Sequence, residues 1–306
     1  MTKKDDSLIF TMIIATRPWS FTLTIISVLI GTFIVSPAMI NWLYFILVLA
    51  GMIILHAATN VLNDYFDHKN GIDFEGAPTT LYRKHPLVSG AMKPKAIFME
   101  AVVLYCIAGI IGLFLILQIG WPIAVFAAIG GFASIAYTGW YINYKYRALG
   151  EIAVFLMWGP LMIFSSYYIQ VQNWDMLIPV VLIAIPHGLW VTLVILANNL
   201  KDIDFDNQSN IKTAGTILKK RGTLRLYRIL IAALYIICGF FIAIKLLPVW
   251  SILVILSLPK TIGLIKHLQS SDEIPANADP VTAQTGTIFG ILFAGSLILG
   301  NMFPIW

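Results

Sequence analysis

The most regular feature of this sequence is a series of apolar runs separated by short polar segments. A helix needs about 20 apolar residues to cross a bilayer core of roughly 30 Å, and the runs recur at about that length along the whole chain. The pattern predicts an all-α integral membrane protein with about nine transmembrane helices. The expected spans are 18–36, 40–62, 95–117, 121–139, 149–169, 176–198, 225–246, 248–266 and 283–303.

The composition supports this prediction. Hydrophobic residues make up 59% of the 306 residues and charged residues only 11%, whereas soluble domains have roughly 25% charged residues. No soluble domain of ordinary size fits between the runs, so we expect one polytopic membrane domain over residues 1–306. The N-terminal segment lacks a small-residue cleavage site before a short apolar core, so we expect the first run to remain as a helix.

Basic residues are concentrated in every second loop between the expected spans. They gather before the first span and in the loops after the second, fourth, sixth and eighth spans, whereas the opposite loops hold one, Lys245. Cationic residues favour the cytoplasmic side, so we expect a cytoplasmic N-terminus and an external C-terminus in the cell membrane. The net charge of +5 therefore indicates topology, and nucleic-acid binding is not expected. Acidic residues favour the same loops, with Asp175 as the clear exception.

Two clusters of carboxylates and amides lie at the cytoplasmic ends of the second and sixth expected spans. Within each, side chains recur every three or four residues, which places them on one helix face. The first cluster contains Asn60, Asn63, Asp64 and Asp67. The second cluster contains Asn198, Asp202 and Asp206. Two such stripes form a weak internal repeat, and the associated loops cover about 63–94 and 199–224.

Oxygen ligands of this kind suit Mg²⁺, which is usually held by one or two carboxylates together with substrate phosphate oxygens. If the two clusters face each other, they would clamp a diphosphate through Mg²⁺. The alternative is that both are solvated helix ends, but polar groups clustered at a membrane boundary are costly and usually functional. Other polar residues beside the clusters, expected to bind an ion or assist proton removal, are Asp73, Glu151 and Asn199.

Basic residues near both clusters are candidates for contact with the diphosphate. The strongest are Lys145 and Lys201, followed by Lys69, Arg83 and Lys212. For the last three the alternative is that their charge only orients the chain in the membrane. His56 and His187 lie on apolar helices, and we expect neighbouring helices to satisfy them; no spacing of His and Cys indicates a zinc site.

At these motifs the sequence resembles the UbiA superfamily of intramembrane prenyltransferases. The resemblance rests on "NVLNDYFDHKNGID", on "NNLKDIDFD" and on a Tyr-x-x-x-Lys element from Tyr141 to Lys145. It implies helices around a central cavity and Mg²⁺-dependent transfer from a polyprenyl diphosphate. "RPWSFTLTIISVLIGT" and "YRALGEIAVFLMWGP" are similar to the 1,4-dihydroxy-2-naphthoate polyprenyltransferases of menaquinone synthesis. The first motif departs from strict spacing, because Gly71 stands where an Asp is expected and the acid follows at Asp73.

Three further residues are assigned to the reaction. Arg17 begins the first span, and a guanidinium binds a carboxylate in a bidentate way, which suits the dihydroxynaphthoate that the resemblance implies, with CO2 lost on alkylation. The alternative role of Arg17 is an interfacial anchor. The rings of Tyr137 and Tyr141 would face the acceptor and the allylic cation, and Trp158 is another candidate for contact with the cation, although packing is the commoner role of such aromatics.

Other functions remain open on the sequence alone. The loop "YRKHPLVSG" is also similar to relatives that use 4-hydroxybenzoate or geranylgeranylglyceryl phosphate as the acceptor. A relative that cyclises its isoprenoid would need no acceptor. A secondary transporter would also gather ionisable residues between helices, but near the bilayer midplane, whereas these carboxylates lie at helix ends.

Overall fold

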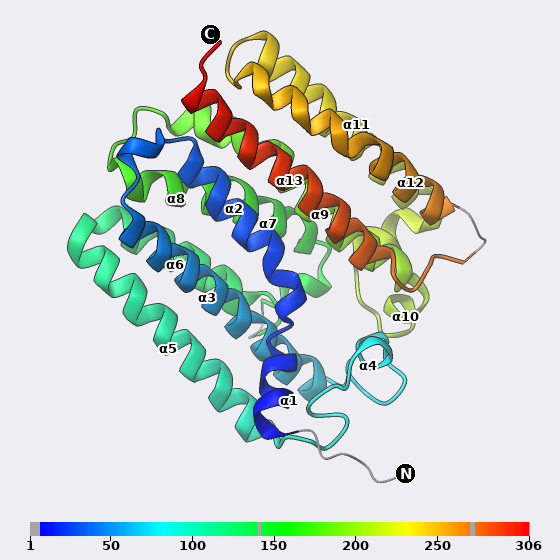
Figure 1. Cartoon of the computed structure of the whole chain (residues 1–306). Coiled ribbons are helices and arrows are strands. Elements are labelled where there is room, and N and C mark those ends of the chain that lie inside the picture. The colour runs from blue at the N-terminus through cyan, green and yellow to red at the C-terminus, as the bar shows by residue number, and fades with distance from the viewer. Residues whose placement is uncertain (1–6, 140–141, 270–272, 306) are drawn as a thin grey trace.

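The computed structural model describes residues 7–139, 142–269 and 273–305. Across these ranges the chain is helical and forms no strand, apart from an isolated bridge between Arg147 and Lys212. The long helices run roughly alongside one another in a single bundle, with the described N-terminal and C-terminal ends at opposite ends of it (Figure 1). The fold is therefore the all-α membrane fold that the apolar runs predict.

Within the described residues, eight helical segments are long and apolar enough to cross a membrane. The predicted span at 121–139 is the exception, because its helix α6 covers only Trp121–Ala136, which is 16 residues. The other long helices are α3 (Trp42–Lys69), α5 (Pro94–Ile119), α9 (Leu177–Lys201), α11 (Ala214–Ala243), which is kinked at Lys219, and α13 (Ala278–Met302). The shorter segments η5 (Val249–Ser257) and α12 (Leu258–Gln269) join end to end as one further span.

The first span is longer than predicted and is broken. It consists of α1 (Leu8–Ala15), a short turn η1 (Pro18–Ser20) and α2 (Phe21–Phe33). Arg17 has a φ of 55° at the break. Proline has no N–H and disfavours a helical conformation in the residue before it, so Pro18 ends the first helix here. Arg17 therefore has a non-helical backbone conformation between α1 and η1.

The fifth span contains a local change of helix type. Helix α7 (Gly150–Leu156) continues into a π-helical turn, η4 (Met157–Leu161), and then into α8 (Met162–Val171). Pro160 lies inside this turn and removes one backbone donor. Ser27 of α2 donates to the carbonyl oxygen of Trp158 at 2.8 Å, so the turn is fixed to a neighbouring helix.

At both clusters the helices extend beyond the predicted ends of the spans. Helix α3 runs to Lys69, so the whole first cluster is helical. In the second, α9 ends at Lys201 and α10 (Ile203–Gln208) begins after Asp202. The backbone bond from Asp206 N to Asp202 O, at 2.8 Å, keeps the spacing of four across this junction. Helix α11 begins at Ala214, earlier than predicted, because Thr213 and Thr216 form a capping box.

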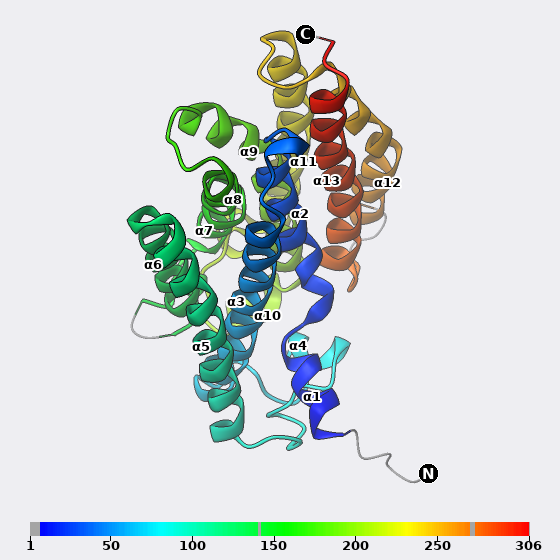
Figure 2. The ribbon, with the colours of Figure 1, turned by 60° about the vertical axis from the view of Figure 1, so that its left-hand side comes forward.

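Close packing holds the bundle together. Helix α3 packs against α5, α9 packs against α11 and α13, and α2 packs against α8 and α13. A Cβ atom at Gly31 of α2 would lie 2.3 Å from the carbonyl oxygen of Ile163, so only glycine permits this approach. In both views α1, α4 (Pro78–Tyr82) and α10 lie toward the same end of the bundle, away from the C-terminus (Figure 2). This end carries both clusters.

Candidate active site

Asp64 is the most enclosed acid of the first cluster, with no exposed surface. One of its oxygens, Oδ1, accepts from Arg17 Nη2 at 2.5 Å and from Arg83 Nη2 at 2.6 Å. Among the described residues its other oxygen, Oδ2, has no hydrogen-bond partner, and the same holds for Nε of both arginines and Nη1 of Arg83. Buried polar atoms are normally paired, so these atoms have unused capacity for a ligand.

Asp73 lies next to Asp64 although the chain leaves the helix between them. Its carboxylate accepts from Thr79 Oγ1 at 2.5 Å and lies 3.0 Å from His85 Nε2. His85 Nδ1 accepts the backbone N–H groups of Leu87 and Val88, so Nε2 carries the proton. Burial opposes the charge on Asp73, but the hydrogen bonds from His85 and Thr79 outweigh it and lower its pKa to about 2.

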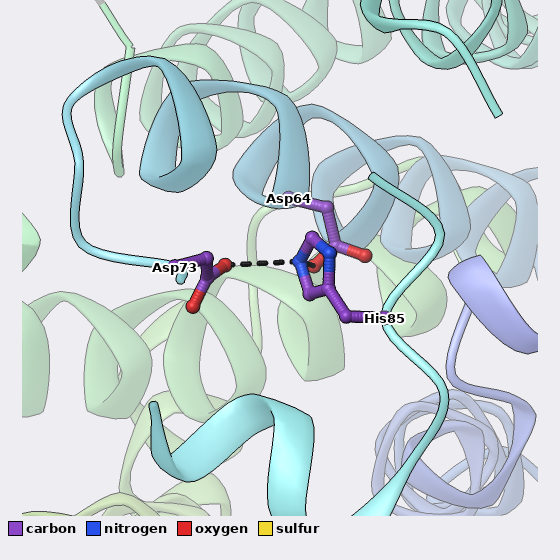
Figure 3. Close-up of side chains that lie close together, drawn as sticks. All are labelled: Asp64, Asp73 and His85. Carbon is purple, nitrogen blue, oxygen red and sulfur yellow. Dashed lines mark hydrogen bonds and ion pairs between the residues drawn. The ribbon is translucent and has the colours of Figure 1, made fainter. Parts of the chain in front are cut away.

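Asp64, Asp73 and His85 form a compact group within the described residues (Figure 3). Each offers one ligand atom, and these atoms lie within 4.8 Å of one another. The sequence pattern had indicated the two acids but not His85, which is in the loop after the motif and carries no spacing signal. The two carboxylates offer the oxygen ligands that a divalent cation such as Mg²⁺ prefers, and His85, whose Nε2 carries its proton, holds Asp73 beside Asp64.

Asp67 is held from the adjacent loop by two consecutive residues. Lys145 Nζ lies 2.7 Å from Asp67 Oδ2 and 3.3 Å from Asn63 Oδ1. The hydroxyl of Tyr146 donates to the other oxygen of Asp67. Burial opposes the charge on Lys145, but Asp67 raises the lysine pKa above its ordinary value, so the ammonium stays charged. The structure thus brings Lys145 to the first cluster.

The aromatic candidates surround the same lysine. Lys145 Nζ lies 6.0 Å from the ring centroid of Tyr137 and 5.5 Å from that of Tyr146. Tyr141 falls outside the described residues. Tyr146 was missed by sequence reasoning, although its position directly after Lys145 in the Tyr-x-x-x-Lys element was a usable signal.

The second cluster is less well neutralised by the protein. Burial raises the pKa of Asp202 to about 6 and that of Asp206 to about 7, and Asp202 adds a repulsive contribution at Asp206. Lys201 lowers the pKa of Asp202 only in part, because its Nζ turns to Asp279 Oδ1 of α13 at 2.8 Å and to Asn198 Oδ1 at 3.3 Å. Carboxylates whose pKa is raised in this way would be stabilised by an added cation.

Glu151 has a structural role in the second cluster. Its Oε1 accepts from Asn199 Nδ2 of α9 and from the backbone N–H of Ala214, both at 2.7 Å. It therefore joins α7 to the end of α9 and the start of α11. Gly215 permits this approach, since a Cβ atom there would lie 2.4 Å from the Asn199 carbonyl oxygen.

The two clusters lie close together across the loops. The charge of Lys145, which contacts Asp67, also acts on Asp202 and Asp206. Phe74, in the loop after the first cluster, lies 5.9 Å from Phe205 of α10, measured between ring centroids. A backbone hydrogen bond of 2.7 Å from Ala148 N to Lys212 O connects the two loops that flank this region.

Three predicted residues occupy more peripheral or structural positions. Lys69 is exposed and lies 5.8 Å from the ring centroid of Tyr65. The side chain of Lys212 is exposed too. Asn60 donates to Thr16 O at 2.9 Å and to Ser20 Oγ at 3.2 Å, so its amide holds the break beside Arg17.

Comparison with known proteins agrees with this geometry. Residues 24–300 match the UbiA prenyltransferase family. The chain is 30% identical to the 1,4-dihydroxy-2-naphthoate octaprenyltransferase of Bacillus subtilis (strain 168), over 93% of this chain and 91% of that protein. It is 28% identical to UbiA prenyltransferase domain-containing protein 1 of Xenopus tropicalis, over 94% and 84%.

Solved structures show the same fold. A UbiA homologue from Archaeoglobus fulgidus, bound to GPP and Mg²⁺, superposes with a TM-score of 0.68 at 14% identity, over 94% of this chain and 99% of that one. A digeranylgeranylglyceryl phosphate synthase gives a TM-score of 0.64 at 19% identity, over 97% and 99%. The family match and the Bacillus subtilis relative show that the protein is an enzyme, and they lend no support to the transporter alternative. The chain is a member of the UbiA prenyltransferase family and is a polyprenyltransferase.

Proposed function

We propose that the protein transfers a polyprenyl group from its diphosphate to 1,4-dihydroxy-2-naphthoate, releasing diphosphate and CO2, as a step of menaquinone synthesis. The named Bacillus subtilis relative, similar over nearly the whole chain, supports this acceptor. The observation that carries the proposal is the pair of acidic clusters at one end of the bundle, with Lys145 bound to Asp67 and its charge lowering the pKa of both Asp202 and Asp206.

The residues present fit a divalent cation. Asp64 has a buried oxygen without a partner among the described residues, and burial raises the pKa values of Asp202 and Asp206, so an added cation would stabilise their charged forms. Bound Mg²⁺ would neutralise the charge that builds on the departing diphosphate. The residues proposed to hold it are Asn60, Asn63, Asp64, Asp67, Asn198, Asp202 and Asp206, with Asp73, His85 and Asn199 close to them.

The chain's own cations would then bind and orient the two anionic substrates. Lys145 is charged and partly accessible, with 28% of its side chain exposed, so it can reach a phosphate oxygen while it stays beside Asp67. Lys69 and Lys212 are exposed, and Lys201 is paired with Asp279. The unused N–H groups of Arg17 and Arg83 face no protein acceptor among the described residues, which suits them to a carboxylate or a phosphate.

Transfer requires the allylic carbon to oxygen bond to break, with the electron pair leaving on the diphosphate. The ring of Tyr137 beside Lys145 presents a π face that favours a nearby cation. Apolar side chains between the helices would shield the allylic cation from water. The prenyl tail would lie in lipid or along the bundle.

Prenyl transfer by purified protein in lipid nanodiscs tests the proposal. Labelled polyprenyl diphosphate, Mg²⁺ and one acceptor at a time are combined, and products are separated by chromatography. We expect transfer to 1,4-dihydroxy-2-naphthoate with release of CO2, and loss of transfer on chelation or in Asp202→Asn. Alkylation of 4-hydroxybenzoate or geranylgeranylglyceryl phosphate instead would overturn the acceptor. An isoprenoid hydrocarbon formed without acceptor would overturn the reaction class.

We also propose that the site faces the cytoplasm across the cell membrane. The alternation of basic loops supports this orientation. A cysteine introduced by Ser209→Cys should be protected from a membrane-impermeant maleimide in intact cells, and one introduced by Asn173→Cys should be labelled. The reverse pattern would invert the topology.

A further inference from the structure

A third polar group lies deeper in the bundle than either acidic cluster. His56 is on α3, four residues before Asn60 and eight before Asp64. On a helix this places it on the same face, about 12 Å farther from the acidic end. Its Nδ1 lies 2.8 Å from Thr24 Oγ1, and its Nε2 lies 3.3 Å from Ser20 Oγ. Both partners are on the first span.

The surrounding donors fix the tautomer of His56. The indole N–H of Trp158 can only donate, and it occupies a lone pair of Thr24 Oγ1 at 2.8 Å. Thr24 is fully buried, so its hydroxyl proton is satisfied by donating to His56 Nδ1. The proton of the imidazole is therefore on Nε2. Ser20 can accept it, because its own hydroxyl donates to Arg17 O at 2.8 Å.

His56 is partly accessible, although it lies within an apolar helix. Arg17, Tyr137 and Lys145 of the active site are partly accessible too. A side chain with accessible surface can contact a bound molecule. His187 is different, because it has no exposed surface. His56 can therefore contact a ligand, whereas His187 belongs to the packed interior.

Two further rings stand beside His56. Its ring centroid lies 5.4 Å from that of Phe21 and 5.1 Å from that of Trp158, both in edge-on arrangements. Both neighbours are also partly accessible. Edge and face contacts of this kind suit a planar aromatic guest. The π-helical turn at Met157–Leu161 sets the position of Trp158.

We propose that Phe21, His56 and Trp158 seat the aromatic ring of the acceptor, and that His56 Nε2–H donates to a hydroxyl oxygen of that ring. This inference rests on the proposed function, because it presumes a hydroxylated aromatic acceptor. The bond to Ser20 is long at 3.3 Å, and Ser20 keeps its bonds to Arg17 O and Asn60 when the N–H turns to the ring. His56 orients the acceptor and takes up no proton.

Equilibrium binding of non-reacting probes tests this contact separately from turnover. The probes are 2-naphthoate, 1-hydroxy-2-naphthoate and 4-hydroxy-2-naphthoate, measured without prenyl donor in nanodiscs. The wild-type protein should bind one hydroxylated probe about 5-fold more tightly than 2-naphthoate, the effect of one neutral hydrogen bond. His56→Leu should abolish this preference. His56→Gln, which retains an N–H near the same place, should keep most of it.

Two more variants complete the design. Ser20→Ala removes the competing acceptor for Nε2–H, so the hydroxyl preference should be kept or increased, and this result stands even if His56→Leu does not fold. His187→Gln is the matched control and should leave the preference unchanged. In turnover, His56→Gln should raise the acceptor KM and leave the donor KM unchanged.

An undiminished preference in His56→Leu would overturn the inference, and so would a loss of preference in Ser20→Ala with the fold intact. The proposed function fails by a different result, which is the absence of prenyl transfer to any aromatic acceptor by the wild-type protein. Transfer with unaltered hydroxyl preference in every variant would leave the function standing and remove only the role of His56.

Discussion

Replacing Lys145 with methionine separates the two roles that the structure gives this residue. In the absence of substrate the ammonium occupies Asp67 Oδ2 at 2.7 Å and Asn63 Oδ1 at 3.3 Å. In the proposed complex it also binds the diphosphate. Lys145→Met keeps most of the apolar stem beside Tyr137 and Tyr146 and removes only the charge.

The expected loss follows from the exposure of the side chain. A hydrogen bond to a charged group contributes about 1.5–3 kcal/mol. Because 28% of the Lys145 side chain is accessible, solvent screens part of this interaction, and we expect kcat/KM for the prenyl donor to fall about 10- to 50-fold. Removal of the ammonium also frees Asp67 Oδ2 and removes a like charge, so Mg²⁺ binding without donor should tighten by about 3-fold or more.

The two effects have opposite signs, which makes the prediction easy to refute. Donor kinetics come from the labelled transfer assay, and metal affinity comes from titration with Mn²⁺ monitored by electron paramagnetic resonance. Lys95→Met, at an exposed position on α5, is the matched control and should change neither quantity. If Mg²⁺ and donor affinity fell together in Lys145→Met, the lysine would be supporting the fold and not competing for the site.

Three substitutions test other parts of the structure, each measured as the free energy of unfolding in detergent and as transfer activity. Glu151→Ala leaves two donors without their acceptor and should cost about 2–6 kcal/mol; a neutral result would remove its role in joining α9 to α11. Gly31→Ala should cost about 1–3 kcal/mol through overpacking against α8, whereas Gly109→Ala, which meets nothing within 4 Å, should not destabilise. Arg83→Met should cost about 1.5–3 kcal/mol, because Asp64 then keeps a single guanidinium; an unchanged stability would show that Arg17 alone satisfies it.

The transmembrane helices could be predicted from the sequence because each must satisfy a length set by the bilayer. Their ends could not. Helix α3 continues to Lys69 because the carboxylates of its last turns are bonded by residues distant in sequence, such as Arg17 and Lys145. A prediction from the hydropathy of this segment alone ends the helix before these carboxylates. The break at Arg17 depends on Pro18. A prediction based on the mean hydropathy of a segment does not take the backbone effect of a single proline into account.

The acidic clusters could also be predicted, since a spacing of three or four defines a helix face. The pairing of charges could not. The contact of Arg17 with Asp64, which is far away in the chain, was not predicted, and the binding of the acceptor by Arg17 stays a prediction. His85 and Tyr146 reach the site through loop conformations that no periodicity encodes. His56 was predicted to be satisfied by a neighbouring helix, and it is, but its accessibility emerges only when three helices are placed together.

The central claim is that the two acidic clusters share divalent ions around one diphosphate. Crystals grown with a prenyl thiolodiphosphate and Mn²⁺ would test it by anomalous scattering at the manganese edge. The account predicts peaks within ligand distance of both Asp67 and Asp202, with the diphosphate between them. Peaks confined to one cluster, with the other facing only solvent, would contradict it.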